Sequence, residues 1–411
     1  MENHQPTIDS RLTTAFGWHR GRDTNYKYKK LSRGADIRLL RLKRGSGDDR
    51  ISISLQCAKL GGKPHYEALS YAWGDNHETH KMYIDGHVMM VTANLHSALR
   101  GVRSKNCSRI LWVDAMSINQ DDIEERDEQV QKMKMVYKSA GRVIVWLGDE
   151  APQDVIAFQM IQAFNDCADL HGYRVYVPPN EPFPAGNETA VLKMDSFIGS
   201  NYTASQLRIF GDFLCRPWFR RLWVVQEIAF HQEVKMICGA QQTNWFSFWR
   251  FIRRLATHVQ QMALGHENPH FLKCIISTGM ARETVLYGGL VDSGSDHKYL
   301  SKQTHHSFIF LYHSTRFHLA TDPKDRIYAL HGFLDPEDSQ NIAVDYSKSC
   351  KELYKRVSEY CITDKKDLFC LQFVGGPSRK SLDLPSWVPD WDALNGNDQP
   401  LMFLFGEAAG T

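Results

Sequence analysis

The chain has 411 residues and a formal net charge of +2, which gives no basis for a nucleic-acid partner. Its hydrophobic content of 43% and charged content of 23% are those of an ordinary globular protein with one or two domains. Nine cysteines are scattered without a Cys-x-x-Cys pair, and no apolar run reaches the length of a membrane span. We therefore expect a soluble, cytoplasmic protein with reduced thiols and no transmembrane segment.

The beginning of the chain is locally basic. Residues 1–44 contain eleven Lys and Arg against four Asp and Glu, an excess of seven positive charges. We predict a basic, partly disordered leader over residues 1–35. The alternative is a segment that contacts an acidic partner or a membrane surface.

Strand patterns dominate the next part of the chain. Polar and apolar residues alternate on both sides of a Gly-Ser-Gly-Asp turn and again around Asp85-Gly86, a dipeptide typical of two-residue hairpin turns. In chain order, the pattern predicts a hairpin at 37–58, a strand at 66–71, a second hairpin at 82–91, a helix at 94–102 and a buried strand at 110–113.

A helix is expected after Asn119-Gln120, because four acidic residues crowd its first turn, where they complement the helix dipole. Arg126 lies on the inward stripe of this helix, and a buried strand follows at 143–147. The order of strand, helix and strand predicts an α/β fold with a doubly wound, mostly parallel sheet of the flavodoxin type, with N-terminal β-hairpins.

The rest of the chain has mainly helical periodicity. We predict a domain at 36–240, followed by a mainly helical region at 241–411. Within these parts, the patterns indicate a helix at 154–170, an exposed Pro-rich loop at 177–186, a strand at 234–238, helices at 245–263 and 307–320, and a flexible segment at 264–305.

Residues 216–228 are the most unusual stretch, because they read as one helix that is apolar on most sides and carries a single acid, Glu227. Pro217 suits the first helical position. A carboxylate buried beside aromatic side chains loses its hydration, so it either pairs with a cation or is kept for chemistry. The cation would be Arg220 or an arginine elsewhere in the chain.

Two further groups of polar residues follow predicted strands. Ligands bind beyond the carboxyl ends of strands in open parallel sheets, and residues 71–75 and Asp114 occupy such ends. Trp73 offers a face for stacking, and Gly74 allows close approach of the backbone to a ligand. Two structural alternatives stay open: Trp73 as a core aromatic with Asp75 in a turn, and an ion pair between Asp114 and Arg126.

Several common site types have no support in the sequence. His77-Glu78-Thr79-His80 has the wrong spacing for a zinc-binding His-Glu-x-x-His helix, so we expect no metal. The Gly-x-Gly-x-x-Gly and phosphate-loop signatures of dehydrogenases and ATPases do not occur, and neither does the nucleophile elbow of serine hydrolases.

Three blocks, at 66–75, 111–148 and 216–228, occur in an order that closely resembles the fungal heterokaryon-incompatibility (HET) domain. Segments 321–330 and 384–391 resemble the region that usually follows that domain. The resemblance implies that residues 36–240 are a HET domain, and that the protein is a fungal non-self recognition effector whose activation triggers programmed cell death. Members commonly carry a cysteine where this chain has Ser117, which argues against a thiol nucleophile at that position.

The chain is also similar in plan to TIR domains, in which a helix-borne glutamate, usually four residues after a tryptophan, supports cleavage of NAD. Glu227 stands four residues after Trp223. This resemblance implies an NAD glycohydrolase that is switched on by self-assembly, with Glu227 as the catalytic carboxylate, NAD or a related nucleotide as substrate, and no cofactor. The implied substrate-binding residues are Tyr71, Trp73, Gly74, Asp75, Asp114, Arg126 and Trp223.

Tyr71 or Trp73 would stack on a base, and Arg126 would meet a phosphate. The competing hypothesis is a non-enzymatic signalling module for a protein partner of unknown identity, in which Glu227 belongs to a buried ion pair. For catalysis, Glu227 is expected within about 10 Å of Trp73 and Asp114, the scale of a small-molecule cleft.

Overall fold

The structure is a computed structural model that describes residues 26–31, 36–47, 49–75, 77–174, 186–259, 270–287, 308–374 and 382–392. The predicted leader at 1–35 lies outside the described residues except for 26–31. The predicted Pro-rich loop at 177–186 lies outside them except for its last residue.

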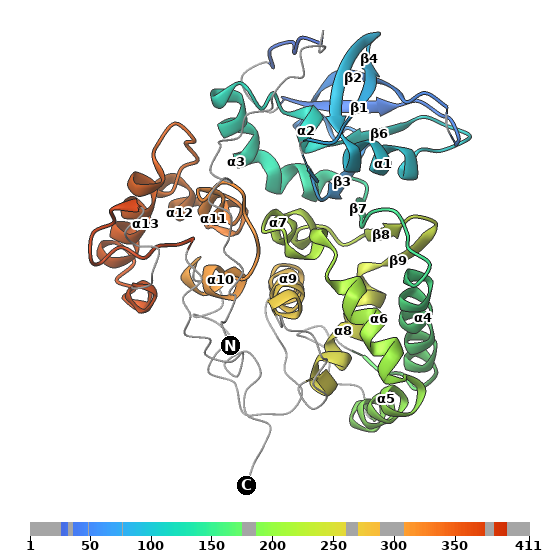
Figure 1. Cartoon of the computed structure of the whole chain (residues 1–411). Coiled ribbons are helices and arrows are strands. Elements are labelled where there is room, and N and C mark those ends of the chain that lie inside the picture. Colours follow the sequence, from blue (N-terminus) through green and yellow to red (C-terminus); the bar gives the residue numbers. More distant parts are fainter. Residues whose placement is uncertain are drawn as a thin grey trace, which may run out of the picture.

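In the described part of the chain, nine strands form one sheet in the order β5-β4-β2-β1-β6-β3-β7-β8-β9 (Figure 1). Both predicted hairpins are confirmed, and the Asp85-Gly86 turn has the two positive φ angles, 48° and 86°, that a type I′ turn requires. The strands are β1 (Asp36–Leu42), β2 (Ser52–Lys59), β3 (Glu67–Tyr71), β4 (Thr79–Ile84), β5 (His87–Thr92), β6 (Arg109–Trp112), β7 (Val143–Trp146), β8 (Val234–Cys238) and β9 (Gln241–Asn244).

The centre of the sheet is parallel and its margins are mixed. Strands β6, β3, β7 and β8 pair in parallel, whereas β1 pairs antiparallel with β6, and β9 antiparallel with β8. Numbered by their order in the chain, the four parallel strands β3, β6, β7 and β8 lie in the spatial order 2-1-3-4. Flavodoxin-like sheets have the same order, and their ligands bind where the winding reverses. The α/β fold class is therefore confirmed.

Helices cover both faces of this sheet. Leu69 and Tyr71 of β3 pack with the residues of α1 (Ala93–Val102), whereas Ala68 belongs to the core on the opposite face with α3 (Ile123–Ser139) and α7 (Trp223–Ala229). Successive residues of a strand point to opposite faces, so Ser70 shares the face of Ala68 and looks toward α7. The helix α2 (Asp114–Ser117) follows β6 directly, and Ser117 is buried with its hydroxyl accepting a hydrogen bond from the Val113 amide.

A second set of helices lies beyond β8 and β9 (Figure 1). The first of them confirms the predicted helix at 154–170 with both ends correct. An aromatic cluster that includes Phe164, Phe210 and Phe251 joins three of these helices. The helices are α4 (Asp154–Leu170), α5 (Asn187–Asn201), α6 (Ala204–Leu214) and α8 (Trp245–Val259).

The region after β9 is helical in its described part, as predicted. It comprises α8 to α13 and short 3-10 turns, with α9 (His270–Tyr287), α10 (Phe308–Thr315), α11 (Asp325–Tyr328), α12 (Pro336–Asn341) and α13 (Cys350–Thr363). The expectation of a flexible segment at 264–305 is wrong for 270–287. Buried residues run consecutively from Cys274 to Thr278, so this helix is enclosed on several sides and lacks the one-sided periodicity used for the prediction.

The stretch at 216–228 is not one continuous helix, which corrects the sequence-based prediction. A 3-10 turn at Pro217–Arg220 ends at Arg221, which has extended backbone angles, and α7 begins at Trp223. Leu319 causes the break: its amide donates to the Arg220 carbonyl, and its carbonyl accepts from the Leu222 amide at 2.9 Å. The same pairing ends the predicted helix at 307–320 early, at Thr315.

Replacing Leu222, which is 1% exposed, by Ala should lower the free energy of unfolding by about 2–5 kcal/mol, because a large core side chain leaves a cavity. The matched control is Leu192→Ala on α5, where the side chain is 69% exposed and the change should stay within about 0.5 kcal/mol. Urea unfolding measures both variants. Equal effects would show that residues 217–229 do not belong to the core.

Candidate functional site

The guanidinium of Arg221 joins the three sequence blocks at one point. It donates a hydrogen bond to the carbonyl of Tyr71, at the end of β3. Its Nη2 atom lies 3.4 Å from Oε1 of Glu227 on α7 and 3.9 Å from Oδ2 of Asp114, which follows β6. The extended backbone at Arg221 therefore places one cation between the carboxylates of the second and third blocks.

Glu227 lies behind this arginine and is only 1% exposed. Its Oε2 atom accepts a hydrogen bond from the hydroxyl of Ser70, and Trp218 Nε1 donates to that hydroxyl at 2.8 Å. Burial raises the pKa of Glu227 to about 7, although the charge of Arg221 acts in the opposite direction. The carboxylate is therefore partly protonated near neutral pH.

Three groups contact the carboxylate of Asp114. Trp73 Nε1 donates to its Oδ2 atom at 2.7 Å, the Ala115 amide donates to its Oδ1 atom at 2.7 Å, and Arg221 lies beside it. Burial raises the pKa of Asp114, and Arg221 lowers it in part. Burial, followed by the negative charge of Asp114, raises the pKa of Tyr71 well above its ordinary value, so Tyr71 stays neutral.

A cavity of about 580 Å³ opens beside this cluster, at the carboxyl ends of β3 and β6. Six of the seven predicted substrate-binding residues line it: Trp73, Gly74, Asp75, Asp114, Arg126 and Trp223. The remaining one, Tyr71, is 1% exposed, and neither it nor Glu227 is among the lining residues. Because Nη2 of Arg221 is close to both carboxylates, the Glu227 and Asp114 oxygens lie within the expected distance of about 10 Å.

The C-terminal region forms one wall of the cavity, which the sequence blocks alone did not predict. Leu319, Ala320, Thr321, Asp325 and Tyr346 all line it. The density of polar residues in the segment at 321–330 was the signal that could have indicated this wall. The cavity is thus built from both the three-block domain and the region that follows it.

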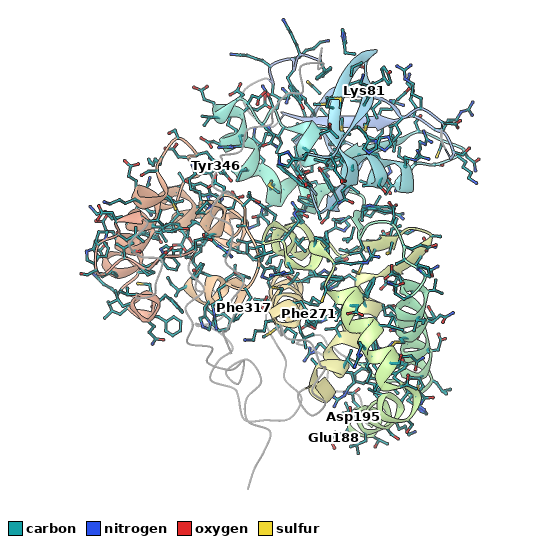
Figure 2. All side chains as sticks on the ribbon, viewed as in Figure 1. Lys81, Glu188, Asp195, Phe271, Phe317 and Tyr346 are labelled. Atoms are coloured by element: carbon teal, nitrogen blue, oxygen red, sulfur yellow. The ribbon has the colours of Figure 1, made fainter. Side chains whose placement is uncertain are left out.

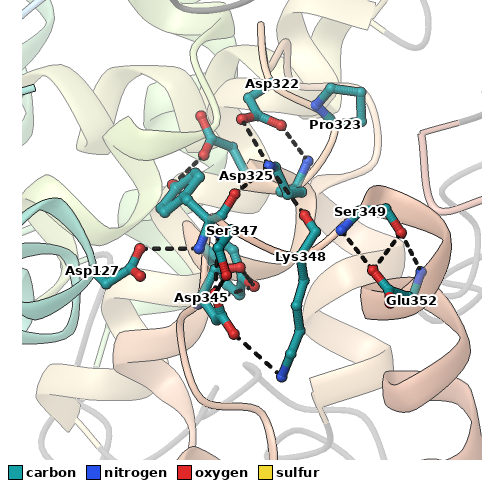
Figure 3. Close-up of polar contacts among 12 residues, drawn as sticks. Asp127, Asp322, Pro323, Asp325, Asp345, Ser347, Lys348, Ser349 and Glu352 are labelled. Carbon is teal, nitrogen blue, oxygen red and sulfur yellow. Dashed lines mark hydrogen bonds and ion pairs between the residues drawn. The ribbon is translucent and has the colours of Figure 1, made fainter. Parts of the chain in front are cut away.

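Asp325 is the centre of this wall (Figure 3). Its carboxylate accepts hydrogen bonds from Trp223 Nε1 at 2.9 Å and from the hydroxyl of Tyr346. Burial raises the pKa of Asp325 to about 6. Through these two bonds the C-terminal region holds Trp223, the first residue of α7, at the edge of the cavity.

Arg126 and Tyr346 attach α3 to the same wall, and Figure 2 shows Tyr346 beside α3. The Arg126 guanidinium lies 3.8 Å from the centre of the Tyr346 ring, and the Tyr346 amide donates to Asp127 at 3.0 Å. The ion pair of Asp114 is with Arg221. Arg126 is therefore placed in the cavity, over an aromatic ring.

The block at 71–75 both lines the cavity and makes structural contacts, the two roles that the sequence left open for it. Trp73 is half-buried and lines the cavity, while its indole nitrogen holds Asp114. Gly74 has a φ of +79°, and a Cβ there would lie 3.1 Å from Cβ of Asn94, so a larger residue would be strained. Asp75 accepts from the His77 amide at 2.8 Å, which is the turn contact that the structural alternative predicted.

Neither a group of side chains for a metal ion nor a helix suited to cross a membrane occurs among the described residues. No group of three or more His, Cys, Asp or Glu side chains there is arranged to hold a metal ion. None of the helices described is both long enough and apolar enough to cross a membrane.

Comparison with known proteins agrees with the three blocks. Residues 66–227 match the family described as Heterokaryon incompatibility protein (HET). The chain is also 26% identical, over 410 aligned residues, to Heterokaryon incompatibility protein 6, OR allele, of Neurospora crassa. That alignment covers 87% of this chain and 58% of the relative, so the chain spans little more than half the relative's length. No solved structure matches.

Stability should depend on pH through Glu227. Its pKa is about 7 in the folded state against an ordinary 4.5, so the folded state binds the extra proton between these pH values. The stabilisation from this group is complete below about pH 4.5 and is lost as the pH rises through 7. Wild type should therefore lose up to about 3 kcal/mol of unfolding free energy relative to Glu227→Gln between pH 5 and pH 8.

Urea unfolding of both proteins at the two pH values measures this difference, and the shared background of Asp325 cancels between them. A wild type that gains stability relative to Glu227→Gln as the pH rises would show that Glu227 is stabilised as an anion by Arg221.

Proposed function

We propose that this chain is a fungal non-self recognition effector that triggers programmed cell death, and that it does so in the cytoplasm by hydrolysing NAD or a related nucleotide. The match to the HET family and the relative named for heterokaryon incompatibility support the cell-death role. The observation that carries the enzymatic part is Glu227, a buried carboxylate with a raised pKa, linked through one guanidinium to the wall of a cavity.

The reaction breaks the bond between C1′ of the ribose and the nicotinamide nitrogen. Both bonding electrons pass to the positively charged ring, which leaves as neutral nicotinamide, while water adds to C1′ and releases a proton. The transition state has oxocarbenium character, and a carboxylate beside the ribose stabilises that charge. The low-dielectric surroundings of Glu227 strengthen this interaction.

Arg221 determines when Glu227 can act. In the state described, its guanidinium lies between Glu227 and Asp114, so the catalytic carboxylate is sealed from the cavity. Activation requires the guanidinium to leave Glu227. Asp114 lies within reach to retain it, and the backbone bridge between Arg221 and Leu319 is the element that a rearrangement would release. Self-assembly, as implied by the resemblance to TIR domains, is the trigger we propose.

One observation favours the competing function, a non-enzymatic signalling module. Glu227 already has an ion-pair partner in Arg221, a hydrogen bond from Ser70 and almost no exposure, which is the arrangement of a structural ion pair. In that case the blocks would build a docking surface for a protein partner. The two functions differ in what Glu227→Gln does.

Glu227→Gln keeps the shape of the side chain and its contact with Ser70 but removes the charge that the transition state requires. If Glu227 is catalytic, the variant should fold normally, bind NAD about as well as wild type, and lose both nicotinamide release and toxicity in a fungal host. Nicotinamide release by the purified, concentrated protein and cell viability measure these effects. Glu233→Gln, at a side chain that is 58% exposed, is the matched control and should keep both activities.

A folded Glu227→Gln protein that still releases nicotinamide would contradict the catalytic assignment. A variant that unfolds because Arg221 is left without its partner, with a loss of about 3–5 kcal/mol, would support the structural ion pair. Toxicity without nicotinamide release in wild type would support the signalling module.

A further inference from the structure

Three arginines line the cavity, and their guanidinium groups differ in the partners they contact. Arg221 is held by Glu227, Asp114 and the Tyr71 carbonyl. Arg126 lies against the ring of Tyr346. Among the residues that the structure describes, Arg220 has no ion pair and no side-chain hydrogen bond, and its Nε atom is buried without a partner. Arg220 is thus a cation at the cavity wall whose charge is not compensated.

The backbone around Arg220 is held by hydrogen bonds, so a loosely held segment does not explain why its side chain has no partner. Its carbonyl accepts the Leu319 amide, and it ends the 3-10 turn that begins at Pro217. The neighbouring side chains of Trp218 and Phe219 are buried in the core. A guanidinium nitrogen that is buried without a hydrogen-bond acceptor costs stability unless a ligand supplies the acceptor.

The acids of the cavity do not supply that acceptor. Asp114 and Asp325 each accept at least two hydrogen bonds, and an oxygen of Asp75 accepts the His77 amide. Among the described residues, none of these acids forms an ion pair or a hydrogen bond with Arg220, so its guanidinium is left to an anionic ligand group.

We infer that Arg220 is the phosphate-binding residue of this cavity, and that the ligand is a phosphate-bearing molecule with an aromatic base. Arg offers paired N–H donors that match phosphate oxygens. Trp73 and Trp223 provide the aromatic surfaces, and a cavity of about 580 Å³ has the size of small-molecule sites. This inference rests on the proposed function for the nucleotide class, and it replaces Arg126 as the phosphate contact.

The test compares ADP with adenosine, which share the base and ribose and differ by the phosphates. Isothermal titration calorimetry should show that wild type binds ADP more tightly than adenosine. Arg220→Gln should weaken ADP binding about tenfold to a hundredfold, as expected for the loss of a charge-assisted hydrogen bond, and leave adenosine binding unchanged. Arg208→Gln, at an exposed arginine of α6 outside the cavity lining, should bind both ligands like wild type.

A thermal unfolding measurement separates this role from a structural one. If Arg220 is kept for a ligand, Arg220→Gln removes an uncompensated charge, so the melting temperature of the ligand-free protein should stay equal or rise. ADP should then raise the melting temperature of wild type more than that of the variant. A lower melting temperature in the ligand-free variant, with ADP binding unchanged, would show a structural role and overturn the inference. Failure of wild type to prefer ADP over adenosine would overturn it as well.

The experiments distinguish failure of this inference from failure of the catalytic proposal. If Arg220→Gln loses ADP binding and wild type releases no nicotinamide, the phosphate site stands and hydrolysis fails. If nicotinamide release depends on Glu227 but ADP binding is insensitive to Arg220, hydrolysis stands and the phosphate site fails.

Discussion

The structure around the cavity depends on one desolvated group, a guanidinium between two carboxylates. Arg221 carries one positive charge, and Glu227 and Asp114 together carry two negative charges when both are ionised. A buried cluster with a net negative charge is costly, so it takes up a proton instead. Burial raises the pKa of both acids, and the charge of Asp114 raises that of Glu227 further, although Arg221 acts on both in the opposite direction. The hydroxyl of Ser70 and the amide of Ala115 donate to the carboxylate oxygens that Arg221 does not contact.

The contacts that position the Arg221 guanidinium also join the three-block domain to the C-terminal region. Arg221 reaches both carboxylates because its backbone is extended, and Leu319 holds the backbone of residues 220 and 222 on either side. Tyr346 and Asp325 then fasten Trp223 and α3 to the same wall. The family match ends at residue 227, but the cavity does not, because its lining continues to residue 346.

Local patterns were sufficient wherever a segment's structure depends on its own residues. The alternation around Asp85-Gly86 and the periodicity of 154–170 gave correct elements, and strand ends gave four residues of the cavity lining. The break at Arg221 could not be predicted, because its cause is Leu319, far away in the sequence. For the same reason the sequence left the partner of Glu227 open between Arg220 and an arginine elsewhere, because the change of backbone conformation between Arg220 and Arg221 was not predicted.

Arg220 and Arg221 show how one change of backbone conformation separates two roles. Both are arginines of a single apolar stretch, yet one compensates the buried acids and the other is left without an anion. A fold optimised only for stability would pair both, or would replace Arg220 by an apolar residue of similar size. Costs of this kind, an uncompensated cation and a glutamate held partly protonated, persist where function requires them. The cavity lies at the carboxyl ends of parallel strands, which is where open α/β sheets bind ligands, so the charge arrangement and the fold indicate the same site.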